Sequence, residues 1–148
     1  MSAFDTQIAG SHYKSLPIQP VEFILANQLG FAEGNVIKYV LRDKDGLQDL
    51  LKARHYIQFI EEAPLYRRML YQVRMAANIG AWWSHALDVD RFITANGITN
   101  PRAGVIRHIA FWNCRGQLSD LDAAAKWLDE LIATMQPDVK IGIDHHPI

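Results

Sequence analysis

The chain has 148 residues, 49% hydrophobic and 21% charged, which is the size and composition of one ordinary domain and not of a disordered tail. Its formal net charge of -1 provides no overall field to recruit DNA or an anionic membrane, so neither is an expected partner. We expect a cytoplasmic location, because no stretch approaches the ~20 apolar residues of a membrane span and the first residues lack a signal-peptide pattern. The single cysteine, Cys114, cannot form an internal disulfide.

Apolar residues recur at helical spacing along almost the whole chain, which predicts an all-α fold. The segment 11–20 contains Pro17 and Pro20 and is expected to be extended, with Pro20 in the first turn of a helix. Predicted helices then cover residues 21–29, 34–42 and 47–62, and residues 64–86 are also compatible with a helix.

The pattern repeats when the chain is shifted against itself by 69 positions, and by 71 positions after the loop that follows the second helix. The repeat keeps polar matches as well as apolar ones, for example Asn27 with Asn96 and Asp49 with Asp120. Because amphipathic periodicity alone does not require polar matches, we infer a tandem duplication of a three-helix unit. The general similarity of amphipathic helices is the alternative.

This repeat predicts two related three-helix units packed into one helical domain. The first unit is residues 10–62, a connecting helix is 63–80, a degenerate second copy is 81–135 and a polar tail is 136–148. Burial is expected to follow the repeat at Phe23, Ile24, Ile37, Leu50, Ala53 and Ile57, and at Phe92, Ile93, Ile106, Leu121, Ala124 and Leu128.

The predicted helix 34–42 has one apolar and one polar side. Helical geometry brings four residues together on the polar side, namely Asn35, Lys38, Tyr39 and Arg42. Cations and an amide near a helix N-terminus opened by Gly34 are the groups that bind a phosphate. The alternative is the ordinary solvated face of an amphipathic helix.

The second copy does not keep this polar side. Three positions of the first copy are replaced, Asn35 by Gly104, Arg42 by Phe111 and Lys52 by Ala123. This asymmetry indicates that the first copy carries a site and that the second was kept for packing or assembly. Asp49, which both copies keep, is interpreted as a cap of the third helix.

Four stretches of the first unit resemble one family. They are Ser11-His12-Tyr13-Lys14, Pro20-Val21-Glu22-Phe23-Ile24, Gly34-Asn35-Val36-Ile37-Lys38-Tyr39-Val40-Leu41-Arg42 and Asp49-Leu50-x-Lys52-Ala53 with Tyr56-Ile57. In combination they resemble the small nucleotide-kinase-like domain of tailed-phage proteins, over about residues 10 to 62. The second half departs from the pattern, since it lacks equivalents of His12, Asn35 and Arg42.

The resemblance implies a phage-encoded, nucleotide-handling protein that phosphorylates deoxynucleoside monophosphates without a P-loop. A nucleoside triphosphate would be the phosphate donor, and the need for Mg²⁺ stays open. The residues expected to act on the phosphates are His12, Lys38 and Arg42, and those expected to bind substrate are Tyr13, Lys14, Asn35, Tyr39 and Lys52.

Other motifs give no site. The sequence lacks the Gly-Lys-Ser/Thr end of a P-loop, and the calcium-loop-like start at 43–46 has Arg54 where the closing Glu should stand. Glu61 and Glu62 have no facing acidic pair, and the tail residues 144–146 are interpreted as polar, so no metal site is expected. The tryptophans, Trp82, Trp83, Trp112 and Trp127, are expected in the core or at subunit contacts.

Two further functions remain open at this point. The same cations would serve a non-catalytic protein that binds nucleotides or sequesters a nucleotide signal. A helical module that binds a host protein is the third possibility, favoured if the aromatic surface of the second copy is an interface. A homo-oligomer is expected in each case.

Overall fold

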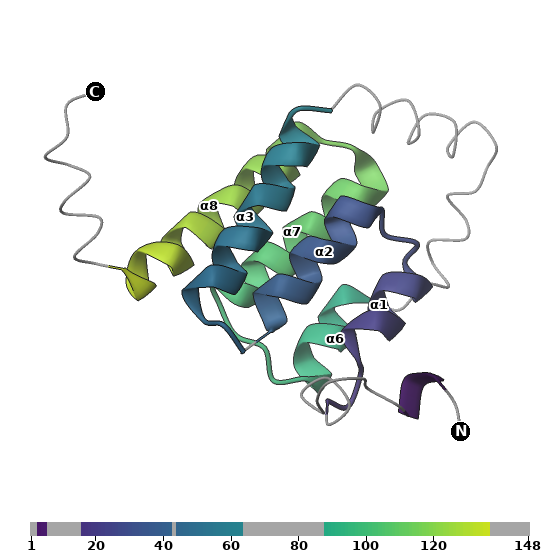
Figure 1. Ribbon diagram of the computed structural model, residues 1–148. Coiled ribbons are helices and arrows are strands. Elements are labelled where there is room, and N and C mark those ends of the chain that lie inside the picture. Colours follow the sequence, from purple (N-terminus) through teal and green to yellow (C-terminus); the bar gives the residue numbers. More distant parts are fainter. Residues whose placement is uncertain (1–2, 6–15, 43, 64–87, 137–148) are drawn as a thin grey trace, which may run out of the picture.

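The computed structural model describes residues 3–5, 16–42, 44–63 and 88–136 of the chain. Within these ranges the chain forms α-helices, one short 3-10 helix and no strand, which confirms the predicted all-α class (Figure 1). The elements are η1 (Ala3–Asp5), α1 (Pro20–Ala26), α2 (Phe31–Leu41), α3 (Leu47–Glu61), α6 (Val89–Ala95), α7 (Arg102–Arg115) and α8 (Leu118–Met135). The predicted connecting helix, residues 63–80, lies almost wholly outside the described residues, as does the tail from residue 137.

Helix α1 begins as predicted and ends earlier. Pro20 occupies its first helical position, where the missing N–H costs no hydrogen bond. The helix stops at Ala26 with Asn27 as C-cap, and Gln28 then takes a left-handed conformation with φ of 50°. The predicted continuation to residue 29 is therefore wrong.

Helix α2 begins at Phe31, three residues before the predicted start at Gly34, and Gly30 is its N-cap. Gly34 lies inside the helix, where a Cβ would stand 3.2 Å from Cγ2 of Ile24 in α1. This glycine thus serves the close approach of two helices. Because the helix begins earlier, Asn35 is not near an open helix N-terminus, and that part of the predicted phosphate site is wrong.

Helix α3 matches its predicted bounds to within one residue. Asp49, predicted to cap it, instead accepts a hydrogen bond of 2.9 Å from the backbone N–H of Asp45, ahead of the helix. Gly46 is the N-cap, with φ of 52°, a conformation that favours glycine. Asp49 therefore holds the loop that leads into α3.

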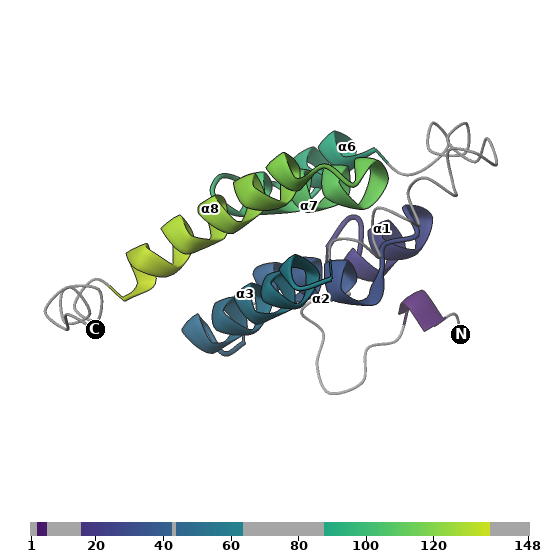
Figure 2. The same ribbon diagram turned by 90° about the horizontal axis from the view of Figure 1, so that it is seen from above.

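The helices form two layers. Figure 2 shows α1, α2 and α3 in one layer and α6, α7 and α8 in the other, and we call these the first and the second unit. Within each unit the second and third helices pack on each other, and between units α2 contacts α7 and α3 contacts α8. Helix order and pairing agree with the predicted repeat. A duplication as the origin of the two units stays a prediction.

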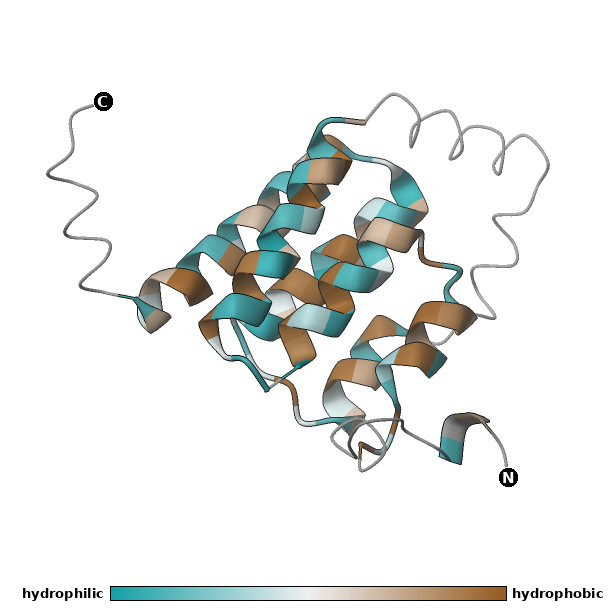
Figure 3. Ribbon diagram, viewed as in Figure 1, coloured by the Kyte–Doolittle hydropathy of each residue, from teal (hydrophilic) through white to brown (hydrophobic). Residues whose placement is uncertain are grey.

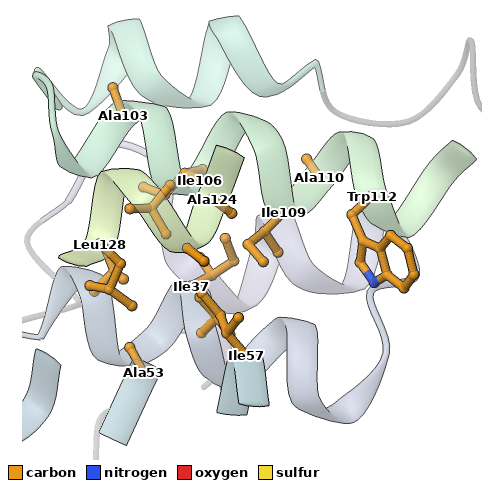
Figure 4. Close-up of a cluster of buried hydrophobic side chains, with 14 of the residues drawn as sticks. Ile37, Ala53, Ile57, Ala103, Ile106, Ile109, Ala110, Trp112, Ala124 and Leu128 are labelled. Carbon is orange, nitrogen blue, oxygen red and sulfur yellow. The ribbon is translucent and has the colours of Figure 1, made fainter. Parts of the chain in front are cut away.

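The core lies between the layers. Figure 4 shows Ile37 and Ile57 of the first unit directed toward Ile106, Ile109 and Leu128 of the second. The side chains predicted to be buried are buried, except that Ile24 is half-buried. Trp112 is fully buried, as expected for the core, whereas Trp127 is partly buried and Trp82 and Trp83 lie outside the described residues. None of the described helices could cross a membrane.

Side-chain amides of the second unit hold irregular backbone of the first. Asn96 accepts a hydrogen bond from the N–H of Ile18 (3.0 Å) and donates one to its carbonyl (2.7 Å). Asn113 accepts from the N–H of Gly30 (3.1 Å) and donates to the carbonyl of Gln28 (3.4 Å). The segments on both sides of α1 are thereby fixed, because buried backbone groups need partners.

Two more hydrogen bonds join α7 to α2. The indole N–H of Trp112 donates to the buried carboxylate of Glu33 (3.0 Å), and Arg102 Nε donates to the carbonyl of Val40 near the other end of α2 (3.0 Å). Helix α2, which carries most of the predicted site, is therefore fixed at both ends by the second unit.

Candidate functional site

The predicted site residues of the first unit fall into two groups. His12, Tyr13 and Lys14 lie outside the described residues. The others lie on the side of α2 and α3 that faces away from the second unit, namely Asn35, Lys38, Tyr39, Arg42 and Lys52. Figure 1 shows these two helices side by side at the front of the molecule.

Cations gather around the ring of Tyr39. Lys38 Nζ lies 5.0 Å from the ring centroid, Lys52 Nζ lies 5.4 Å from it, and the guanidinium carbon of Arg42 lies 6.0 Å from it. All three distances are within the range of cation–π attraction. The structure thus brings Lys52 of α3 to the cations of α2, a convergence that helical periodicity could not predict.

Asn35 does not join this group by hydrogen bonding. Its side-chain Nδ2 donates to the carbonyl of Phe31, one turn earlier in the same helix, at 2.8 Å. The amide therefore serves the first turn of α2.

A set of aromatic rings adjoins the cations, and the sequence analysis missed it. Tyr56 is at its centre: its ring is stacked with Tyr39 (centroids 6.0 Å apart) and meets Phe31 edge-on (5.9 Å) and Phe59 at a tilt (5.8 Å). His55 adds a further contact with Phe59 at 4.6 Å. Residues 52, 55, 56 and 59 recur at helical spacing, and this was the available signal.

An open cavity of about 320 Å³ lies within this set. Its lining is Tyr39, Lys52, His55, Tyr56 and Phe59. Phe31 lies beside the cavity and is 79% exposed, while Phe59 is 51% exposed. We call the whole surface the α2–α3 face, defined by Phe31, Lys38, Tyr39, Arg42, Lys52, His55, Tyr56 and Phe59.

Arg42 is held loosely by two carboxylates. Its Nε lies 3.9 Å from Asp49 and its NH2 lies 4.0 Å from Asp45, distances too long for hydrogen bonds. Asp49 is fully buried, and one of its carboxylate oxygens has no hydrogen-bond partner among the described residues. The guanidinium of Arg42 is therefore oriented over Tyr39 without being fully paired.

The second unit has a tighter version of this pair. Arg115 donates to Asp120, the counterpart of Asp49, from NH2 at 2.9 Å and from Nε at 3.2 Å. The position that aligns with Arg42 is Phe111, as the sequence analysis states, but Arg115 forms a corresponding ion pair from a position further along α7. An Arg–Asp pair is thus a shared structural element, and its looseness is specific to the first unit.

Packing explains another difference between the units. Gly104 stands at the position of Asn35, and a Cβ there would lie 2.5 Å from the indole ring of Trp127. The ring of Trp127 occupies the space that a side chain would need. The difference between Asn35 and Gly104 is therefore explained by packing and gives no information about a ligand.

On the second unit, the positions that match the α2–α3 face differ in their charges and in their partners. Arg107, at the position of Lys38, donates twice to Asp90, at 3.1 and 2.9 Å. His108, at the position of Tyr39, has Nδ1 3.7 Å from Asp120. Ala123 replaces Lys52, so this surface has no comparable gathering of cations among the described residues.

Arg54 also lies on α3, but it connects the two units and does not belong to the α2–α3 face. It donates to Asp129 of α8 and to Glu61, each at 2.9 Å. Burial acts to lower the pKa of Arg54, but the hydrogen bonds and charges of Glu61 and Asp129 outweigh it, so the pKa is raised.

Among the described residues, no group of three His, Cys, Asp or Glu side chains could hold a metal ion.

Comparison with known proteins gives a match in the first unit. Residues 8–58 are similar to a family described as a protein of unknown function, DUF3310. The match covers α1, α2 and most of α3, which includes nearly the whole α2–α3 face. No curated protein and no solved structure matches the chain. The chain is therefore similar, over its first unit, to a family without an assigned function.

Proposed function

We propose that the protein binds a nucleotide on one part of the α2–α3 face, formed by the cavity and the cations around Tyr39. The observation that carries this proposal is the position of Lys38, Arg42 and Lys52 around the ring of Tyr39, at the edge of a cavity lined by aromatic side chains. A nucleotide combines an anionic phosphate with a flat, polarisable base. The cations of the face are complementary to the phosphate, and its aromatic cavity is complementary to the base.

The phosphate would lie near the cations. Charge-assisted hydrogen bonds to phosphate oxygens are roughly twice as strong as neutral ones, and a guanidinium can donate two in parallel. Arg42 suits this role because its carboxylate neighbours stand at 3.9 and 4.0 Å and leave its hydrogen-bonding capacity incompletely used.

The base would lie in the cavity, against Tyr56 and Phe59. Its volume of about 320 Å³ is at the lower end of the range of small-molecule sites, roughly 300 to 1,000 Å³. Stacking of a base on an aromatic side chain contributes about 1 to 3 kcal/mol. It requires no particular base, so the proposal leaves the choice of base open.

Phosphoryl transfer, which the family resemblance implies, also needs a group that can accept a proton from the substrate. Asp49, the carboxylate beside Arg42, is fully buried and accepts a hydrogen bond from the Asp45 backbone. It is therefore placed to orient Arg42 and not to accept a proton from a substrate. Binding is the function that this part of the chain supports best, and transfer is a separate question for assay.

A thermal-shift screen against nucleoside mono-, di- and triphosphates, with and without Mg²⁺, tests the proposal. A ligand at ~100 times its Kd stabilises the folded state by about 2.7 kcal/mol, which corresponds to roughly 5 to 10 °C in Tm for a chain of this size. We expect such a shift in the native protein and a much smaller one in Lys52→Ala. The variant Lys126→Ala, an exposed lysine on α8, is the matched control. No shift with any nucleotide would contradict the proposal.

A further inference from the structure

The solvent-facing side of the first unit is unusually apolar when compared with the same positions of the second. Large apolar side chains are exposed at Val21, Leu25, Phe31, Leu51 and Phe59. Their counterparts at offsets of 69 or 71 are also exposed, and all are polar: Asp90, Thr94, Asn100, Asp122 and Glu130. Figure 3 shows α1 coloured as apolar over most of its length.

This comparison separates a requirement of the fold from a property of the surface. The two units share helix order and packing, so these positions tolerate polar residues in the same structural context. In the second unit, the exposed large apolar side chains among the described residues are Leu118 and Met135, at the two ends of α8. A concentration of apolar side chains on one unit indicates a surface that contacts something other than water.

The α2–α3 face has more aromatic surface than one nucleotide can cover. The cavity suited to a base does not include Phe31, which meets Tyr56 edge-on and is 79% exposed. A second base stacked on Phe31 would use this ring. Cations on α2 and α3 would then lie beside the phosphates that join the two nucleosides.

We propose that the α2–α3 face binds a single-stranded polynucleotide, with consecutive bases stacked on Phe31 and in the cavity of Tyr56 and Phe59. The inference rests on the proposed function and extends it from one nucleotide to a strand. Aromatic platforms interleaved with cations are the usual means of binding single strands without sequence preference. The near-neutral net charge of the whole chain does not oppose strand binding, because these cations are concentrated on one face.

Charge favours this occupant over a second protein. Lys38, Arg42 and Lys52 lie among the rings, where an apolar protein partner would have to bury them. A phosphate backbone instead pairs with these charges and displaces counterions from the strand. The face is thus complementary to alternating flat and anionic groups.

Fluorescence anisotropy with a labelled oligothymidylate of twelve nucleotides, and with its ribonucleotide counterpart, tests the inference in the full-length protein. The mononucleotide dTMP is measured as an unlabelled competitor. We expect either oligonucleotide to bind at least tenfold more tightly than dTMP, and a preference between the two arms identifies DNA or RNA as the ligand. Competition by excess duplex should be weak, since its bases are not available for stacking.

Phe31→Ala separates the strand from the single nucleotide. It should weaken oligonucleotide binding fivefold or more and leave dTMP binding within twofold, because Phe31 lies outside the cavity. Because Phe31 is exposed, its replacement should not disturb folding, and equal Tm values for variant and native protein check this. The matched control, Asn100→Ala at the corresponding position of the second unit, should change neither affinity.

The salt dependence gives a second measurement. For single strands the slope of log Kobs against log salt is about -0.7 per phosphate contact, so contacts by Lys38, Arg42 and Lys52 predict a slope near -2. Lys52→Ala should make this slope less steep by about 0.7.

Three results would overturn the inference. If the oligonucleotides bind no more tightly than dTMP, the proposal of strand binding is wrong and the proposed nucleotide site stands. If neither dTMP nor the oligonucleotides bind, the strand proposal is wrong, and the thermal-shift screen over all nucleotides decides separately whether the nucleotide site exists. If sedimentation shows a dimer that Phe31→Ala converts to a monomer, with no oligonucleotide bound, the face is an interface between copies of this chain.

Discussion

Phe23 and Phe92 stack on each other across the boundary between the two units, with ring centroids 4.4 Å apart and an interplanar angle of 15°. They stand 69 positions apart and occupy the same place in their respective units. Helix α2 also contacts α7, and α3 contacts α8. Contacts between equivalent positions are what a local two-fold arrangement of two units produces.

Replacing either ring should cost about 3 to 5 kcal/mol of unfolding free energy, the usual range for a buried Phe→Ala substitution. The double variant should cost less than the sum of Phe23→Ala and Phe92→Ala, because each single substitution already removes their mutual contact. Urea unfolding of the three variants measures this. Strict additivity would show that the two rings do not stabilise each other.

Gly104 and Gly34 provide a matched pair of tests for close packing. At Gly104 a Cβ would lie 2.5 Å from a rigid indole ring, so Gly104→Ala should destabilise the protein by about 1 to 3 kcal/mol despite the better helix propensity of alanine. At Gly34 the nearest atom is the end of the Ile24 side chain, at 3.2 Å. Gly34→Ala should therefore change Tm much less. The cost of a small displacement of the Ile24 side chain opposes a gain of up to ~1 kcal/mol in helix propensity.

Asp120 and Asp49 should differ in what they stabilise. Asp120→Asn weakens two charge-assisted hydrogen bonds from Arg115 and should cost about 1.5 to 3 kcal/mol in stability without affecting nucleotide binding. Asp49→Asn should lower both stability and affinity, because it removes the charge that orients Arg42. Isothermal titration calorimetry at a temperature where both variants are folded separates the two effects. Equal affinities would show that Arg42 needs no such orientation.

Lys38→Ala should weaken the binding of a nucleotide by about 1.5 to 3 kcal/mol, the cost of one charge-assisted contact. Arg107→Ala, its counterpart on the second unit, should have no effect on binding, since Arg107 is paired with Asp90. Both residues are on the surface side of their helices, so neither change should alter the fold. Equal losses in the two variants would place the phosphate elsewhere.

Phosphoryl transfer can be detected directly by incubating a deoxynucleoside monophosphate with a nucleoside triphosphate and separating the products. If the protein is a kinase, diphosphates of both should form, and His12→Ala or Lys38→Ala should lower kcat more than it weakens binding, because the transferring phosphate is stabilised chiefly in the transition state. A protein that only binds returns both nucleotides unchanged. That outcome would leave the binding proposal intact and exclude the kinase.

Periodicity was sufficient for the features that depend on one helix at a time. It predicted the core side of each helix and the bounds of α3, because apolar spacing and the loop glycine Gly46 act locally. It misplaced the start of α2, where the Gly30 cap is held by Asn113 of the second unit, and sequence patterns do not display such distant partners. The arginine that pairs with Asp120 was missed for a different reason, since Arg115 lies outside the position that aligns with Arg42.

The candidate site was predicted in part. Lys38, Tyr39 and Arg42 were expected to share a side of one helix, and they do. The aromatic half of the face was not predicted, because Phe31 was assigned to a loop and Tyr56 was noted as part of the family resemblance and not as a site residue.

The hydrogen bonds between Asn96 and the backbone of Ile18, and from the backbone N–H of Gly30 to Asn113, tie the two units together within a single polypeptide. Two identical subunits joined in this way would have to carry every substitution twice, on both outer surfaces, and would separate on dilution. A single chain has neither restriction. One surface can be optimised for a ligand while the other is optimised for solubility, and the assembled state persists at any protein concentration.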